Sequence, residues 1–217
     1  MPPLREAVIF FGCLVVAVIL HEVSHGVVAN WLGDDTAKRA GRLTLNPLPH
    51  IDPFGSILLP AMGALAGLPV FGYAKPVPVN PARLRHPRRD MVIVSLAGPT
   101  TNLLLMIGAA LIARAIYASG GSLPGGIDQS STSYLFLEIA FYFALVNLLL
   151  GLFNLLPIPP LDGSALLERF LPERWLPAWY RYRQYGFLIL LGLVLFTGVL
   201  GTVVQPFFNA LRDFVVA

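Results

Sequence analysis

The residues with the clearest chemical potential lie early in the chain, in the sequence HEVSH from His21 to His25. Residues four apart on a helix share a face, so both imidazoles can be directed at one point. Two neutral imidazoles at this spacing suit Zn²⁺, and Glu22 beside the first can act as a general base toward a water that the metal activates. The spacing therefore predicts a hydrolytic zinc site on a helix.

The composition predicts that this helix lies in a membrane. Hydrophobic residues make up 56% of the 217 residues and charged residues 12%, against about 25% charged in soluble domains. An apolar run from Ala7 to Leu20 leads directly into the motif. The net charge of +3 does not indicate nucleic-acid binding, because the basic residues cluster between apolar segments as topology signals do. Cys13 is the only cysteine and is expected to be a small packing residue.

Four apolar segments are long enough to cross a bilayer as helices. They are residues 4–32, 91–118, 134–156 and 185–204, and Gly98-Pro99 should interrupt the second of them. The expected fold is an all-α polytopic membrane protein, a single domain over residues 1–217. It has about four to five transmembrane helices plus a re-entrant or short extended element after the first helix.

That additional element comes from three stretches between the first two spans. Glycines and prolines within Phe54–Tyr73 favour a re-entrant segment buried against protein, with a fifth crossing helix as the alternative. Leu43–Leu45 alternates apolar and polar residues and predicts a short edge strand. Prolines should keep Lys75–Pro81 extended.

The distribution of basic residues predicts the orientation. Residues 38–42, 83–89 and 169–183 are basic, whereas Ser119–Ser133 contains no Lys or Arg. Because basic loops stay in the cytoplasm, these three should be cytoplasmic and the N-terminus outside. Phe54–Tyr73 must then enter and leave on the same side, and the site lies toward the cytoplasm.

Two histidines do not complete a catalytic zinc site, which uses three protein ligands and leaves one position for water. Glu138 is expected near the outer end of its helix, too far from the cytoplasmic side. Asp162 follows the break at Pro157–Pro160, where irregular backbone can line a cavity and a carboxylate needs a cation. Asp162 is the better candidate, although a turn at Asp-Gly would also explain it.

Three groups of residues together resemble the site-2 protease family of intramembrane zinc metalloproteases. They are HEVSH in a membrane helix, AGPTTN at 97–102, and NLLP at 154–157 leading to LDG at 161–163. The segments 41–47 and 75–81 are similar to a compact prokaryotic branch without PDZ or CBS domains. The resemblance implies a multi-pass protein of the prokaryotic plasma membrane. Only twenty residues precede His21, so the leading helix of some family members is expected to be missing.

The resemblance also implies residue roles. His21, His25 and Asp162 would bind one Zn²⁺ per chain, and Glu22 would be the base. Asn154 would hold the scissile carbonyl or its oxyanion, and Asn102 would help to line the site. Hydrogen bonds between helices would also explain Asn154, and helix capping would explain Asn102.

The implied substrates are transmembrane segments of membrane proteins, unwound locally because a helical peptide bond is shielded. Leu43–Leu45 or Lys75–Val79 is a candidate to hold the unwound segment by strand addition. The expected partners are therefore these substrates and the lipid bilayer, with no nucleic acid. The sequence identifies neither the substrate nor the oligomeric state.

Two other classes of function compete with this interpretation, a zinc-binding membrane scaffold without proteolysis and a metal transporter. Glu22 favours an enzyme, because a pure binding protein does not need a base. A transporter tends to carry several acidic and histidine residues along a path, whereas here they converge on one site.

Overall fold

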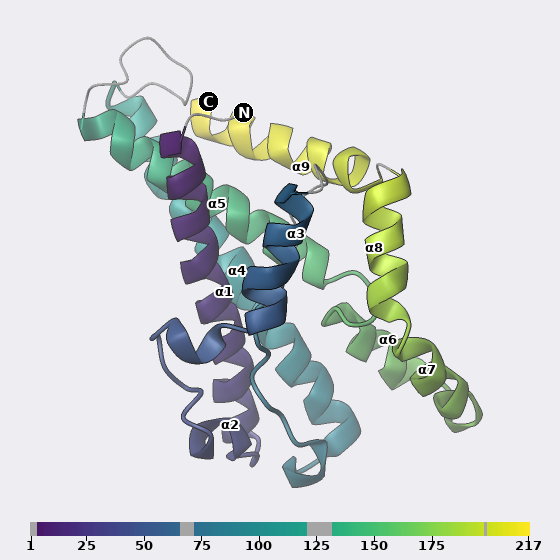
Figure 1. The fold of residues 1–217 in the computed structure, drawn as a ribbon. Coiled ribbons are helices and arrows are strands. Elements are labelled where there is room, and N and C mark those ends of the chain that lie inside the picture. The colour runs from purple at the N-terminus through teal and green to yellow at the C-terminus, as the bar shows by residue number, and fades with distance from the viewer. Residues whose placement is uncertain (1–3, 66–71, 121–131, 198) are drawn as a thin grey trace.

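The computed structural model describes residues 4–65, 72–120, 132–197 and 199–217, and these form helices joined by turns and irregular segments (Figure 1). The helices are α1 (Leu4–Trp31), α2 (Thr36–Arg39), α3 (Leu59–Leu65), α4 (Pro87–Ala118), α5 (Thr132–Asn154), α6 (Gly163–Phe170), α7 (Leu176–Arg183), α8 (Gly186–Thr197) and α9 (Val199–Val216). Short helical turns cover Leu48–His50, Pro53–Leu58, Pro81–Arg83 and Glu173–Trp175. The protein is all-α, as predicted.

Three of the described helices, α1, α4 and α5, are long and apolar enough to cross a bilayer. They correspond to three of the four predicted spans. The fourth, residues 185–204, is divided between α8 and α9, which run in different directions in Figure 1, and residue 198 lies outside the described residues. The total of four to five spans stays a prediction. Most of the predicted outer loop, Ser119–Ser133, also lies outside the described residues.

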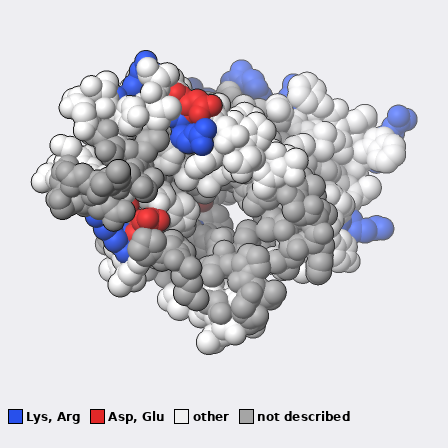
Figure 2. Space-filling view, turned by 90° about the horizontal axis from the view of Figure 1, so that it is seen from above, with Lys and Arg blue, Asp and Glu red and all other residues white. Residues whose placement is uncertain are grey.

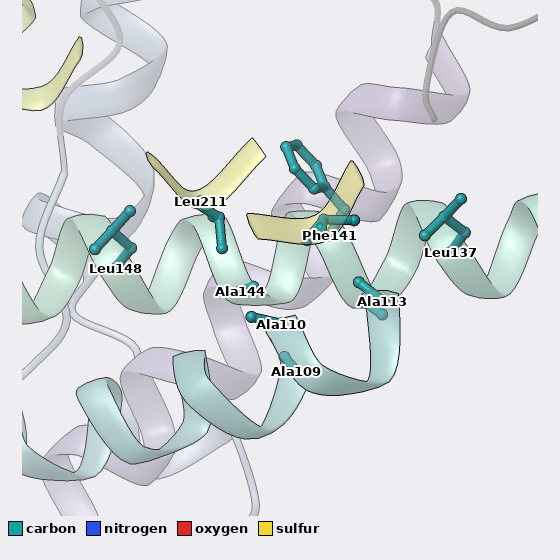
Figure 3. Close-up of a cluster of buried hydrophobic side chains, with 10 residues drawn as sticks. Ala109, Ala110, Ala113, Leu137, Phe141, Ala144, Leu148 and Leu211 are labelled. Carbon is teal, nitrogen blue, oxygen red and sulfur yellow. The ribbon is translucent and has the colours of Figure 1, made fainter. Parts of the chain in front are cut away.

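Small side chains hold α4 and α5 together. Ala109, Ala110 and Ala113 of α4 are buried against α5, where Ala144 faces them (Figure 3). Small residues let helix backbones approach closely in a membrane, where packing rather than hydrophobicity drives association. Leu211 of α9 also belongs to this cluster. The close contact sets the position of α5 relative to α4, and both helices contribute to the site below.

The first helix packs on the same pair. Cys13 and Ala17 of α1 are buried against Val146 of α5, which confirms that the cysteine is a small packing residue. Farther along, Ala29 of α1 is buried against Val94 of α4. The helix α1 therefore packs against α5 before its histidines and against α4 after them.

The prediction that Gly98-Pro99 interrupts the second span was wrong, because α4 continues through Pro99. A proline removes one backbone donor but does not end a membrane helix whose neighbours compensate. Both residues are buried against the rest of the bundle. The small size of Gly98 matters for the site for a different reason, given below.

The predicted edge strand at Leu43–Leu45 was also wrong, since these residues form bends and no described residue belongs to a strand. The Thr44 hydroxyl accepts a hydrogen bond from the Asn46 backbone N–H at 3.1 Å, and the Thr44 carbonyl lies 3.0 Å from Nε2 of His50. Such local hydrogen bonds compete with strand pairing. Lys75–Asn80, in contrast, lies outside regular secondary structure, as its prolines require.

The two ends of Phe54–Tyr73 lie together. The Tyr73 backbone N–H donates to the Gly55 carbonyl at 3.1 Å, and the Ser56 hydroxyl donates to the Tyr73 carbonyl at 2.9 Å. A crossing helix would separate its ends by about 30 Å, the thickness of the hydrocarbon core. These contacts therefore favour the re-entrant alternative, although residues 66–71 lie outside the described residues.

Charge is distributed unevenly along the molecule. Figure 2 shows the end at which both termini lie, where much of the described surface is uncharged and charged side chains form small, separate groups. The basic segments 83–89 and 169–183 accompany the start of α4 and α7, toward the opposite end in Figure 1.

Candidate metal centre

Three side chains from two separate helices meet at one point. His21 and His25 lie one turn apart on α1, with their Nε2 atoms 3.1 Å from each other. Oδ2 of Asp162, at the start of α6, lies 3.1 Å from Nε2 of His21 and 3.4 Å from Nε2 of His25. Both histidines are buried and Asp162 is half-buried. Among the described residues, this is the only group of three such side chains with metal-binding geometry.

The second nitrogen of each imidazole identifies the tautomer. Nδ1 of His25 lies 2.7 Å from the Val94 carbonyl, and Nδ1 of His21 lies 2.5 Å from Oδ1 of Asn102. Both partners are acceptors, so each Nδ1 carries a hydrogen and donates it. In neutral imidazoles this leaves both Nε2 atoms with lone pairs that face one another.

The centre thus brings two imidazole lone pairs and a carboxylate oxygen together, and Oδ2 of Asp162 has no hydrogen-bond donor among the described residues. Converging electron pairs in an apolar span are stabilised by a positive charge between them, which a metal cation can supply. Two histidines and one carboxylate are a ligand set that catalytic zinc uses. The residues present therefore fit Zn²⁺.

The backbone around Asp162 argues against a simple turn residue. Asp162 occupies the N-cap position of α6, yet its side chain makes no capping hydrogen bond. The carboxylate points instead to the two histidines. Gly163 permits this geometry, because a Cβ atom there would lie 2.2 Å from the Leu155 carbonyl oxygen.

Gly98 of α4 lies against the metal centre, which the sequence alone did not indicate beyond its place in AGPTTN. A Cβ atom at this position would lie 2.5 Å from both Nε2 of His25 and Cε1 of His21. Real Cβ atoms do not approach other atoms so closely. Glycine is therefore the residue that lets both imidazoles rest on the backbone of α4.

The predicted base, Glu22, follows His21 directly and is half-buried. Its Oε2 accepts a hydrogen bond from the Val77 backbone N–H at 2.8 Å. Val77 belongs to the irregular segment 72–80, which therefore crosses α1 beside the metal centre. The side chain of Val77 also packs near Gly26 on α1.

The two predicted asparagines have different positions. Asn102 is buried behind His21, on the Nδ1 side of the ring and not on the Nε2 side. Asn154 is half-buried at the end of α5, and its Nδ2 donates to the Leu150 carbonyl of its own helix at 3.0 Å. The structure thus brings together His21, His25, Asp162 and Asn102, whereas Asn154 is hydrogen-bonded away from the ligands.

Comparison with known proteins places the chain in a family. The model of peptidase family M50 matches residues 121–197. A protein of Bacillus subtilis named "Putative zinc metalloprotease YwhC" is 40% identical over 205 residues, which are 92% of this chain and 85% of that protein. The chain belongs to peptidase family M50. The predicted membership of the site-2 protease family is thereby confirmed.

Further relatives match over most of the chain. Two named "Putative zinc metalloprotease Rip2" are each 34% identical. The one from Mycolicibacterium smegmatis aligns over 82% of this chain and 63% of its own length, and the one from Mycobacterium tuberculosis over 89% and 70%. No solved structure matches. This M50 chain is thus a membrane metalloprotease by family.

Proposed function

We propose that this protein is an intramembrane zinc endopeptidase that hydrolyses peptide bonds in or near transmembrane segments of other membrane proteins. The observation that carries the proposal is the convergence of two imidazole lone pairs and one carboxylate oxygen on a membrane-length helix, next to Glu22. His21 lies about 15 Å along α1 from Trp31, which puts the centre inside the apolar span.

In this proposal His21, His25 and Asp162 hold one zinc ion per chain. Bound zinc supplies Lewis acidity, since it lowers the pKa of a coordinated water and polarises a carbonyl. Gly98 keeps room for both imidazoles, and the Nδ1 hydrogen bonds keep their Nε2 atoms available as ligands.

Glu22 supplies the proton transfers. It takes the proton of the attacking water and returns it to the leaving amine, which is general base and then general acid catalysis. The Val77 N–H holds one carboxylate oxygen and so limits the rotation of the side chain. Asn154 would stabilise the developing oxyanion by about 3 kcal/mol, for which its Nδ2 must leave the Leu150 carbonyl.

The same proposal includes the location. One intramembrane domain over residues 1–217 would lie in a prokaryotic plasma membrane, with the site toward the cytoplasm. The basic segments 83–89 and 169–183 support this orientation, because such segments stay in the cytoplasm. So does the contact of Gly55 with Tyr73, which favours a return of the chain to the side it came from.

The test combines zinc content with proteolysis. Purified wild-type protein should contain about one zinc per chain, and Asp162→Ala should contain far less. In liposomes with a panel of synthetic single-span peptides, the wild type should yield cleavage products that mass spectrometry detects. Glu22→Gln should keep its zinc and cleave at least about a hundredfold more slowly, since general base catalysis contributes that much.

The rival functions predict different results. A metal-binding scaffold would give no cleavage with either protein. A transporter would carry zinc into liposomes, and Glu22→Gln would not abolish that transport. Wild-type protein that is folded but free of zinc would remove the basis of the proposal.

A further inference from the structure

A third asparagine, Asn147 of α5, lies behind Asn102. Its side chain is fully buried. Its Oδ1 accepts a hydrogen bond from Nδ2 of Asn102 at 2.8 Å, and its own Nδ2 donates to the Phe143 carbonyl at 2.8 Å. A buried asparagine in a membrane helix is commonly explained by helix packing. The structure instead connects it to His21 through one intervening side chain.

The direction of each hydrogen bond follows from the far end of this chain. The Phe143 carbonyl can only accept, so the Asn147 amide must present Nδ2 to it and Oδ1 to Asn102. Asn102 must then present Nδ2 to Asn147 and Oδ1 to His21. That oxygen accepts a hydrogen from Nδ1 of His21, which leaves Nε2 with its lone pair.

We call the hydrogen bonds that run from the Phe143 carbonyl through Asn147 and Asn102 to His21 the relay. Without Asn147, nothing fixes which way the Asn102 amide faces in this relay. The amide of Asn102 would keep one other acceptor, the Ala17 carbonyl at 3.5 Å, which is a longer contact. A rotation of the amide by 180° would then bring Nδ2 to His21, opposite a ring nitrogen that must accept. The hydrogen of the imidazole would move to Nε2, where it blocks metal binding.

We propose that Asn147 is a positioning residue that sets the tautomer of His21 through Asn102 and so prepares the centre for zinc. The inference rests on the proposed zinc site and adds a residue that touches neither the metal nor the substrate. Asn147 and Asn102 thereby link α5 and α4 to the ligand on α1.

The first test is zinc affinity, measured by competition with a chromogenic chelator on the purified full chain. Asn147→Leu has a similar shape but no acceptor, and it should bind zinc about tenfold more weakly, as losses behind a metal ligand do. Asn147→Asp, which burial should keep protonated, can donate its O–H to the Phe143 carbonyl and keep an oxygen acceptor facing Asn102, so it should bind within about threefold of the wild type. Glu138→Gln is the control, because Glu138 is a buried polar residue of α5 that pairs with Arg5 and lies nine positions, about 13 Å of helix, before Asn147; it should leave zinc affinity unchanged.

The second test asks whether Asn147 acts through Asn102. The double variant Asn102→Ala with Asn147→Leu should bind zinc no more weakly than Asn102→Ala alone, since residues in one network are not additive. Long-range ¹⁵N–¹H NMR of the zinc-free protein, simple because the chain has four histidines, should show the Nδ1–H tautomer of His21 in the wild type. Asn147→Leu should populate the Nε2–H tautomer.

The outcomes separate the two proposals. Wild type that binds no zinc overturns the proposed function. Zinc binding by the wild type, with unchanged affinity and tautomer in Asn147→Leu, overturns the role of Asn147 alone. Equal losses in Asn147→Leu and Glu138→Gln would mean that any buried polar change in α5 disturbs the centre, and would also overturn it.

Discussion

Each histidine of the metal centre is held by the atom behind it as well as by its place on α1. Val94 supplies a backbone carbonyl to His25, and Asn102 supplies a side-chain oxygen to His21. A backbone carbonyl cannot rotate, whereas a side-chain amide can. The tautomer of His21 therefore depends on further residues in a way that the tautomer of His25 does not.

The close contact of Gly98 with both imidazoles can be tested by substitution. Gly98→Ala should reduce zinc affinity at least about tenfold, because its methyl group would lie 2.5 Å from both imidazoles and force them to move. Alanine is a better helix former than glycine by about 1 kcal/mol, so α4 itself should not weaken. Chelator competition and thermal unfolding would be measured together.

Gly108→Ala is the matched control, since it adds a methyl group to the same helix with no atom within 4 Å. It should leave zinc affinity unchanged. Zinc affinity of Gly98→Ala equal to that of Gly108→Ala would contradict the close contact.

The sequence predicts the three proposed ligands but not the hydrogen bonds and packing contacts that hold them in place. His21 and His25 are related by local helix geometry, and Asp162 follows from the proline break and the resemblance to site-2 proteases. Asn102 contacts a residue 81 positions away, and its bond to Asn147 spans 45 positions. No local period encodes such pairs, so the relay and the fit of Gly98 required the packing of α1 against α4 and α5.

The irregular segment 72–80 connects the loop before it to α1, the helix that carries the two histidines of the metal centre. The Lys75 N–H donates a hydrogen bond to the His50 carbonyl, and the Lys75 carbonyl accepts one from the Arg42 side chain. The Val77 N–H donates to the Glu22 carboxylate. Pro76 and Pro78, which alternate with these residues, have no N–H to donate.

This arrangement changes the expectation for substrate binding. Strand addition needs donors as well as acceptors along the exposed edge. In Lys75–Val79 the N–H groups of Lys75 and Val77 are already used and two residues are prolines, so few donors remain for an unwound substrate. The contact of this segment with Glu22 points instead to a role in holding the base.

Asp34 anchors the other end of this segment. Its carboxylate is buried and accepts hydrogen bonds from the backbone N–H groups of Thr36 at 3.0 Å and Asn80 at 2.6 Å, as well as from the Thr36 hydroxyl. Burial raises the pKa of Asp34, but these bonds and the nearby Arg83 outweigh burial and hold the pKa below its ordinary value. The folded protein thus favours the ionised form.

A carboxyl with a lowered folded pKa stabilises the fold above the unfolded pKa of about 3.9, and this contribution disappears as pH falls through the folded value. Asp34→Asn should therefore be less stable than the wild type at pH 6, by about 1–3 kcal/mol for the unsatisfied donor. The difference should shrink as pH falls from 5 to 3. Thermal unfolding in detergent would measure it, and a difference that stays constant over this range would count against the role of Asp34.

At the scale of the whole molecule, the apolar pattern predicts which segments enter the membrane better than it predicts their paths. The spans at α1, α4 and α5 follow from length and hydropathy alone. Phe54–Tyr73 has the length of a span, and only the contact between its ends favours a return. Residues 185–204 read as one apolar run, yet α8 and α9 differ in direction (Figure 1).

A re-entrant Phe54–Tyr73, which leaves the membrane on the side where it entered, predicts a specific topology. The loop containing Lys38 and the loop containing Ala82 should lie on one side of the membrane, and Ser133 at the start of α5 on the other. Single cysteines at these exposed positions, in a Cys13→Ala background, would be labelled in intact bacterial cells with a membrane-impermeant maleimide. Ser133→Cys should react in intact cells, whereas Lys38→Cys and Ala82→Cys should react only after the membrane is opened.

The pair at 38 and 82 decides the path independently of the absolute orientation. If Phe54–Tyr73 crossed the bilayer, these two cysteines would react on opposite sides. Both would react on the same side if the segment returns, even if the basic loops faced outward. The reaction of Ser133→Cys then establishes the orientation, because α4 crosses the membrane once between residues 82 and 133. Labelling of both loop cysteines on the cytoplasmic side would put Glu22 and the three proposed zinc ligands within reach of cytoplasmic water, which the hydrolysis requires.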